Sequence, residues 1–190
     1  MKFKKILYLL LFLILIACET GAEESEKPNE LKKQINEKFS FDKRWSVNAF
    51  KSLPLGKINI ASDKDSVFIF DSRGEIKAFS NNGKKIWNKE LGVDISTGIT
   101  IGFNKLLLSS SNGEVFCLSK ESGEIIWIYS TSGEVLSPPA TNGDIVAIQN
   151  IDGRLTAVDF ETGEFRWDYR SVIPNLTLRG TSEPSFYEGF

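Results

Sequence analysis

The sequence predicts an all-β fold, a β-propeller of four-stranded antiparallel blades with about three blades complete and a fourth begun. Tryptophans recur every 40 residues, at Trp87, Trp127 and Trp167. Each tryptophan follows a glycine by four positions, at Gly83, Gly123 and Gly163. A repeat near 40 residues is typical of propellers, in which one period forms one blade.

Each period carries the signals of four short strands. An aliphatic run leads to a turn dipeptide, at Arg73-Gly74, Asn112-Gly113 and Asp152-Gly153. We expect each dipeptide to form a two-residue hairpin loop with positive φ at both residues. The innermost strands are expected at Ile58–Ala61, Gly98–Gly102 and Val135–Pro139. The blades are therefore predicted at 56–90, 95–130 and 133–171, and a fourth blade starts within 174–190.

The third period contains a specific motif. Ala157, Asp159, Thr162, Gly163 and Trp167 match the pattern AxDxxTGxxxW, which resembles the repeat of pyrroloquinoline-quinone-type propellers. In such repeats the tryptophan ring packs on the neighbouring blade and buries a large apolar surface. The repeat tryptophans are therefore interpreted as structural residues.

A fourth tryptophan lies ahead of the first blade. Trp45 belongs to the strand-like segment Lys43–Asn48, which has no hairpin turn and no partner strand before it. Propellers avoid an open edge when such a strand completes the blade formed by the other end of the chain. We expect residues 43–48 to be this closing strand. Because a ring needs 4 to 8 blades, the sequence is interpreted as a fragment or a truncated gene product.

The N-terminus predicts a lipid anchor. Three lysines precede the apolar run Ile6–Ile16, whose 11 residues are too few to span a bilayer but fit a secretory signal. The next residues, Ala17-Cys18, complete a motif that resembles the bacterial lipobox. Residues 1–17 are expected to be removed and Cys18 to carry acyl chains such as palmitate. Glu19 favours sorting to the outer membrane, and the polar stretch 18–38 is expected to be a flexible tether.

Charge and cysteine content exclude several classes of ligand. Removal of residues 1–17 takes away three of the 23 basic residues and none of the 25 acidic ones, which leaves a net charge near −5. An acidic chain without a basic stripe lacks the charge that nucleic-acid binding requires. Cys117 lies in an alternating apolar run and is interpreted as a buried, inert residue without a disulfide partner.

The most specific resemblance is to the BamB family, the lipoproteins of the machinery that assembles outer-membrane β-barrels. It rests on the lipobox, the blades, the stretch Gly133–Pro139 and the stretch Pro174–Ser182. In that family a Leu-x-Leu-Arg-Gly loop meets the periplasmic domains of BamA. The resemblance implies that Leu176, Leu178 and Arg179 contact BamA. Alternatively, both leucines belong to the core face of the next strand, since their spacing of two is that of a strand.

The resemblance implies a non-enzymatic scaffold at the periplasmic face of the outer membrane of a Gram-negative bacterium. Its partners would be BamA, the rest of the barrel-assembly complex and nascent outer membrane proteins. No cofactor or metal site is expected. Two alternatives remain: a quinone-dependent dehydrogenase, and a propeller that binds peptides or glycans. The chain lacks the adjacent cysteines of such dehydrogenases and has no histidine, the usual base near neutral pH.

Overall fold

A computed structural model describes residues 42–50, 59–171 and 182–187. Except for Asp42, these residues belong to one compact unit, Lys43–Phe190. The predicted signal peptide, tether and lipidated Cys18 lie outside the described residues. So do Leu176, Leu178 and Arg179, the predicted contacts with BamA.

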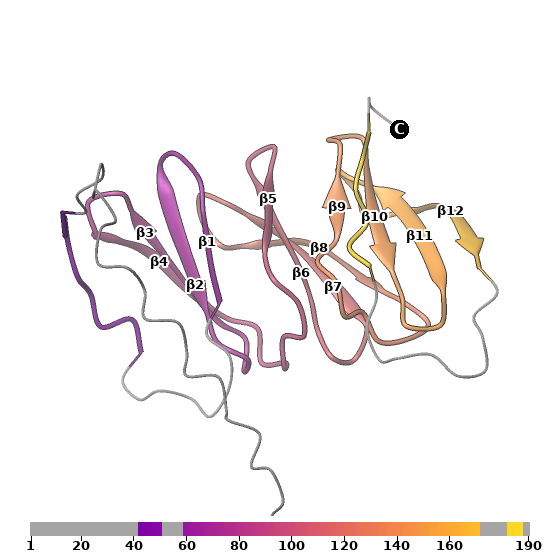
Figure 1. Ribbon diagram of the computed structural model, residues 1–190, viewed down its shortest axis with the longest axis horizontal. Helices are drawn as coiled ribbons and strands as arrows, with labels where there is room; N and C mark the ends of the chain where they lie inside the picture. Colours follow the sequence, from indigo (N-terminus) through magenta and orange to yellow (C-terminus); the bar gives the residue numbers. More distant parts are fainter. Residues whose placement is uncertain (1–41, 51–58, 172–181, 188–190) are drawn as a thin grey trace, which may run out of the picture. The chain divides into compact units, whose positions relative to one another are not determined.

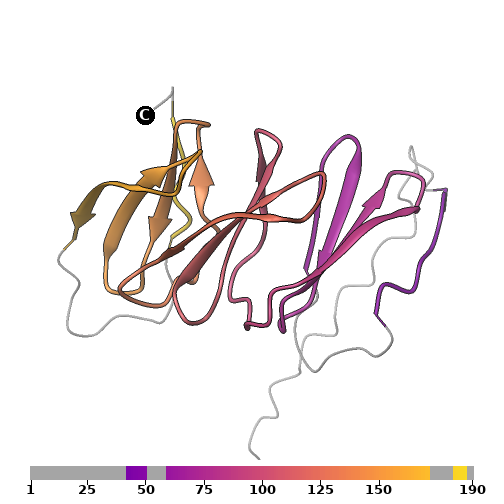
Figure 2. The ribbon, with the colours of Figure 1, turned by 180° about the vertical axis from the view of Figure 1, so that it is seen from behind.

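The described residues form three four-stranded antiparallel sheets, which confirms the predicted all-β propeller architecture. The first sheet contains β1 (Asn59–Ser62), β2 (Ser66–Phe70), β3 (Glu75–Ser80) and β4 (Lys85–Glu90). The second contains β5 (Thr100–Gly102), β6 (Lys105–Ser109), β7 (Glu114–Ser119) and β8 (Ile125–Ser130). The third contains β9 (Ala140–Thr141), β10 (Ile145–Gln149), β11 (Arg154–Asp159) and β12 (Phe165–Arg170). Figures 1 and 2 show the sheets following one another in chain order, one sheet for each period.

The core lies between sheets rather than within one. The first cluster joins residues such as Phe68 and Ile76 of the first sheet to Leu106 and Leu118 of the second. The second cluster joins Leu107, Val115, Cys117 and Trp127 to residues of the third sheet, among them Val146, Ile148 and Val158. Successive side chains of a strand point to opposite faces, so the second sheet packs against both neighbours. All five residues of β6 are consequently buried.

The hairpin loops differ from the prediction. Gly74 has a φ of 84°, but the residue before it has a negative φ, and the same holds at Gly113 and Gly153. The N–H of Asp71 donates to Glu75 O at 3.1 Å, and the N–H of Gly74 donates to Asp71 O at 3.2 Å. These bonds define a three-residue loop, a type I turn followed by a left-handed residue. The predicted two-residue loops are therefore wrong, because the turn needs one left-handed position and glycine supplies it.

The innermost strand of the third sheet also differs from its prediction. We expected a strand at Val135–Pro139, but β9 comprises only Ala140–Thr141. Pro138 and Pro139 have no N–H to donate to a sheet. Val135 forms an isolated bridge with Asn150 instead. Regular pairing therefore begins only after the two prolines, at Ala140.

Three tryptophans each pack on a glycine in a turn of the sheet that comes next in the chain. The indole N–H of Trp45 donates to Asn81 O at 2.9 Å, that of Trp87 to Lys120 O at 2.9 Å, and that of Trp127 to Phe160 O at 3.1 Å. The rings lie on Gly83, Gly123 and Gly163, respectively. A Cβ at Gly123 would stand 2.6 Å from Cε3 of Trp87, so only glycine allows this approach.

Residues 42–50 form no strand within the described part of the chain. Trp45 nevertheless occupies the same position relative to the first sheet as Trp87 does relative to the second. Lys77 also holds this segment, because its Nζ donates to Ala49 O at 2.5 Å and lies 4.4 Å from the centre of the Phe50 ring. The segment is therefore attached to the first sheet by side chains.

We predict that Gly123→Ala lowers the free energy of unfolding by about 3 kcal/mol. The added methyl group would clash with the Trp87 ring, and the positive φ of residue 123 disfavours alanine. The matched control is Gly92→Ala. Gly92 has the same φ of +72°, but a Cβ there meets nothing within 4 Å. The control should lose only about 1 kcal/mol. Urea denaturation measures both changes, and equal losses would contradict the packing argument.

Candidate functional site

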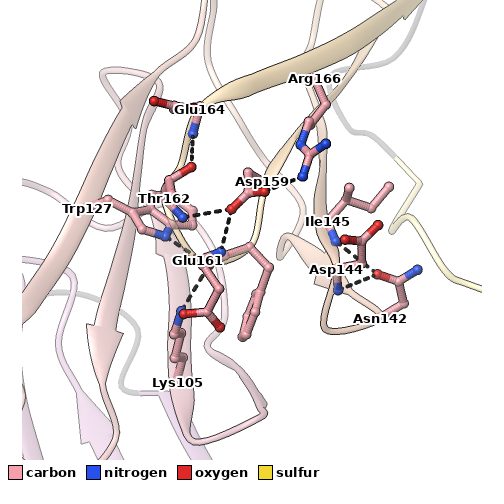
Figure 3. A network of polar contacts seen from close by, with 11 residues as sticks. Lys105, Trp127, Asn142, Asp144, Ile145, Asp159, Glu161, Thr162, Glu164 and Arg166 are labelled. Carbon is pink, nitrogen blue, oxygen red and sulfur yellow. Dashed lines mark hydrogen bonds and ion pairs between the residues drawn. The ribbon is translucent and has the colours of Figure 1, made fainter.

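In the repeat motif of residues 157–167, the polar side chains stabilise a turn (Figure 3). Oδ1 of Asp159 accepts hydrogen bonds from the N–H groups of Glu161 and Thr162, both at 2.8 Å. Oδ2 accepts a hydrogen bond from Arg166 at 2.5 Å. This bond from Arg166 is the main reason that the pKa of Asp159 lies well below its ordinary value. The ionised carboxylate thus fixes the turn on which the Trp127 ring packs.

Two lysines link the second sheet to its neighbours. Lys105 Nζ donates to Phe160 O at 3.1 Å and to Glu161 Oε2 at 2.8 Å (Figure 3). On the other side, Lys120 Nζ donates to Asp63 Oδ2 at 2.7 Å. Burial raises the pKa of Asp63, but the hydrogen bonds from Lys120 and from backbone N–H groups outweigh it and lower the pKa overall. These ion pairs therefore belong to the joints between sheets.

Cys117 is fully buried in the second core cluster. Burial raises the pKa of its thiol from 9.0 to about 12. A thiol with this pKa stays protonated at neutral pH, and the thiolate is the reactive form. Cys117 is consequently unsuited to nucleophilic or redox chemistry.

The described ranges also offer little that would hold a metal or cross a membrane. Among residues 42–50, 59–171 and 182–187, no three His, Cys, Asp or Glu side chains gather as a metal site would require. No helix in these ranges is long and apolar enough to span a bilayer.

The third sheet has a groove on the face turned away from the second sheet. It has a volume of about 500 Å³ and lies between the sheet and residues 184–186. Apolar side chains line most of it, from Ile145, Ala147, Leu155, Trp167, Pro184 and Phe186. The polar lining comes from Asn142, Asp144, Gln149 and Ser185. The groove suits an apolar segment of protein better than a small polar substrate.

The repeat explains why this face is open. Trp87 and Trp127 are 8% and 7% exposed, because a following sheet covers each of them. Trp167 occupies the same position in β12 but is 43% exposed. All six residues of β12 are exposed. The groove is therefore the third copy of a face that is buried between the other sheets.

The predicted contacts with BamA lie outside the residues that the structure describes. Leu176, Leu178 and Arg179 lie between Ser171 and Ser182, which are described, although they themselves are not. Sequence reasoning missed the groove itself. One signal could have revealed it: the glycine that receives Trp87 or Trp127 lies 36 residues after that tryptophan, and no described turn receives Trp167.

Fold and site together define an incomplete β-propeller whose third sheet has an exposed apolar face. A sequence profile of the family described as outer membrane protein assembly factor BamB matches residues 72–189. The chain belongs to this family.

Two relatives illustrate the match. The outer membrane protein assembly factor BamB of Kangiella koreensis is 42% identical over 180 residues, which cover 93% of this chain and 46% of that protein. Its counterpart in Shewanella oneidensis is 28% identical over 192 residues, which cover 93% of this chain and 48% of that protein. The chain thus spans about half the length of these relatives.

Solved structures show the same fold. The crystal structure of BamB from Moraxella catarrhalis matches with a TM-score of 0.61 and 19% identity, over 70% of this chain and 39% of that one. A europium-containing methanol dehydrogenase matches with a TM-score of 0.53 and 15% identity, over 62% of this chain and 25% of that one. At these identities the likeness concerns the fold alone, and it includes an enzyme.

We predict that the buried thiol makes stability depend on pH. Because the folded-state pKa of Cys117 is raised from 9.0 to about 12, its contribution to stability is complete below pH 9 and is lost as pH rises toward 12. Cys117→Val, which cannot ionise, should show a smaller fall in the free energy of unfolding over this range. Urea denaturation at several pH values measures the difference, and parallel curves for both proteins would contradict it.

Proposed function

We propose that this chain is a non-enzymatic scaffold that assists the assembly of outer-membrane β-barrel proteins. The family match over residues 72–189 carries this proposal, because its relatives are named outer membrane protein assembly factors. The fold alone would not suffice, since a methanol dehydrogenase shares it. The apolar groove on the third sheet supports a role in binding proteins.

The proposal includes a lipid anchor. Cys18 would carry acyl chains, residues 18–38 would form the tether, and the blades would lie at the periplasmic face of the outer membrane of a Gram-negative cell. Several acyl chains on one cysteine give stable anchoring, whereas one chain binds only reversibly. The lipobox-like residues before Cys18 support this part of the proposal.

The segment 43–48 would serve as the closing strand of the last blade. Trp45 supports this, since it packs on Gly83 as the tryptophans of outer strands pack on Gly123 and Gly163. A segment that carries the tryptophan of a preceding blade is what ring closure by the two chain ends requires.

The partner proposed for the loop after β12 is the periplasmic part of BamA, with Leu176, Leu178 and Arg179 as contacts. Interface centres are enriched in arginine and large apolar groups. Arginine can also bind a partner carboxylate with two parallel hydrogen bonds. The exposed groove bordered by Trp167 and Phe186 would extend this contact surface. The remaining complex and nascent outer membrane proteins are the further partners proposed.

We predict that Leu176→Ala and Arg179→Glu each abolish co-purification with BamA from solubilised outer membranes. The reason is the loss of an apolar anchor or of a charge-assisted hydrogen bond, at a cost of about 2 kcal/mol or more. Arg170→Glu is the matched control, because Arg170 is an exposed arginine at the end of β12. The control should still co-purify, and circular dichroism should be unchanged in all three. Retained binding of both loop variants would refute the assignment.

Labelling with radioactive palmitate tests the anchor. We predict that the chain incorporates the label when expressed in a Gram-negative bacterium and that Cys18→Ala does not, since no other residue is proposed to be acylated. Cys117→Ala is the control and should remain labelled, because Cys117 is buried. Labelling that survives Cys18→Ala would contradict the anchor.

A further inference from the structure

The last strand of each sheet has a free backbone edge. Within the described part of the chain, β4, β8 and β12 each end a sheet and pair on one side only. A free edge presents unpaired N–H and C=O groups, to which another extended segment can add. The three edges can be compared residue by residue, because they occupy the same position in the repeat.

Hydrogen bonding shows which residues of β8 face outward. The N–H of Thr131 donates to Gly113 O at 2.9 Å, and Tyr129 lies opposite Val115. Residues that bond to the neighbouring strand alternate along an antiparallel pair. The backbone groups of Ile128 and Ser130 are therefore directed away from β7, toward the free edge.

The same reasoning applies to the other two edges. In β4, where Leu91 N–H donates to Gly74 O, the outward positions are Asn88 and Glu90. In β12, where Ser171 N–H donates to Gly153 O, they are Asp168 and Arg170. Only β8 therefore lacks a charge at its outward positions among the three described edges.

The difference extends over the whole strands. Three charged residues occur in β4, at Lys85, Lys89 and Glu90, and three in β12, at Arg166, Asp168 and Arg170. The sequence of β8 is IIWIYS, which has no charge, no proline and no glycine. Charged side chains are the usual means by which a protein prevents edge-to-edge pairing. This protection is present on both flanking sheets and absent from the middle one.

The side chains of β8 are also exposed. Ile126 is 44% and Ile128 49% exposed, whereas Trp127 between them is buried. The β-branched residues fit an extended backbone. An incoming strand would thus gain both main-chain hydrogen bonds and apolar side-chain contacts. A charged strand would find no charged side chain on β8 itself to pair with.

We propose that the free edge of β8 binds an extended, uncharged protein segment with alternating apolar residues, which adds to the second sheet as a fifth strand. Transmembrane β-strands have this composition, since lipid-facing apolar residues alternate with others over about ten residues. This inference rests on the proposed function and assigns nascent barrel strands to a particular edge. The partner is selected by the absence of charge on β8, in contrast to β4 and β12.

Amide hydrogen exchange of the whole mature chain in detergent micelles tests the edge. The probe is a peptide of about ten residues alternating valine and threonine, the length of one membrane-crossing strand. The expected result is slower exchange at the N–H groups of Ile128 and Ser130. The exchange rates at Asn88 and Glu90 should not change. A second peptide, N-methylated at alternate amides, keeps the apolar surface but cannot pair and should give no protection. Protection by both peptides would overturn the proposal.

The matched variants are Ile128→Lys and Asn88→Lys, which add the same charge at equivalent exposed positions of β8 and β4. Affinity for the peptide should fall about tenfold in the first and stay unchanged in the second. Equal affinities would overturn the proposal. So would protection of Ile128 that appears without peptide and rises with protein concentration, because the occupant would then be a second copy of the chain.

The outcomes also separate this inference from the proposed function. If the chain co-purifies with BamA but its β8 edge shows no protection by the peptide, only the edge assignment fails. If the edge is protected as expected but the chain does not co-purify with BamA, the contact through Leu176 and Arg179 fails and the strand-binding edge stands.

Discussion

The packing of an indole ring on a glycine of the next sheet is the contact on which the rest of this structure depends. Each ring needs a turn without a side chain, since a Cβ at Gly83, Gly123 or Gly163 would lie 2.6 to 2.9 Å from ring atoms. The indole N–H then reaches a backbone carbonyl of the same turn. Trp87 and Trp127 each belong to a different sheet from the glycine that receives them, and Trp45 lies outside the sheets, so no sheet can complete this contact alone.

This dependence on neighbours distributes burial unevenly along the chain. The middle sheet packs on both sides, and β6 is buried throughout. The third sheet has the same internal pairing, yet β12 is exposed throughout. Between the first and second sheets, and between the second and third, this apolar surface forms a core. On the outer face of the third sheet the same surface lines a groove. The face that is buried between two neighbouring sheets is thus the same face that is exposed on the third sheet.

Sequence reasoning reached the architecture because it is periodic. The 40-residue spacing of the tryptophans and the glycine turns identified the sheets, and the alternating runs located their long strands. It failed where backbone geometry is decided locally. Val135–Pro139 looked extended, but only Val135 pairs, in an isolated bridge with Asn150, and Pro138 and Pro139 have no N–H to donate. The hairpin glycines were recognised, although a type I turn places only one residue in the left-handed region.

The sequence by itself determined the repeat, the tryptophan and glycine positions, the uncharged character of β8 and the absence of histidine. Only the tertiary structure decided that Trp127 is buried while Trp167 is exposed, although both follow a Thr-Gly or Ser-Gly turn in nearly the same local sequence. It also decided that Ile128 points its backbone toward a free edge. The physical reason is that burial and hydrogen-bond direction depend on which strands lie alongside. Those strands come from other parts of the chain, so the sequence of one strand does not specify them.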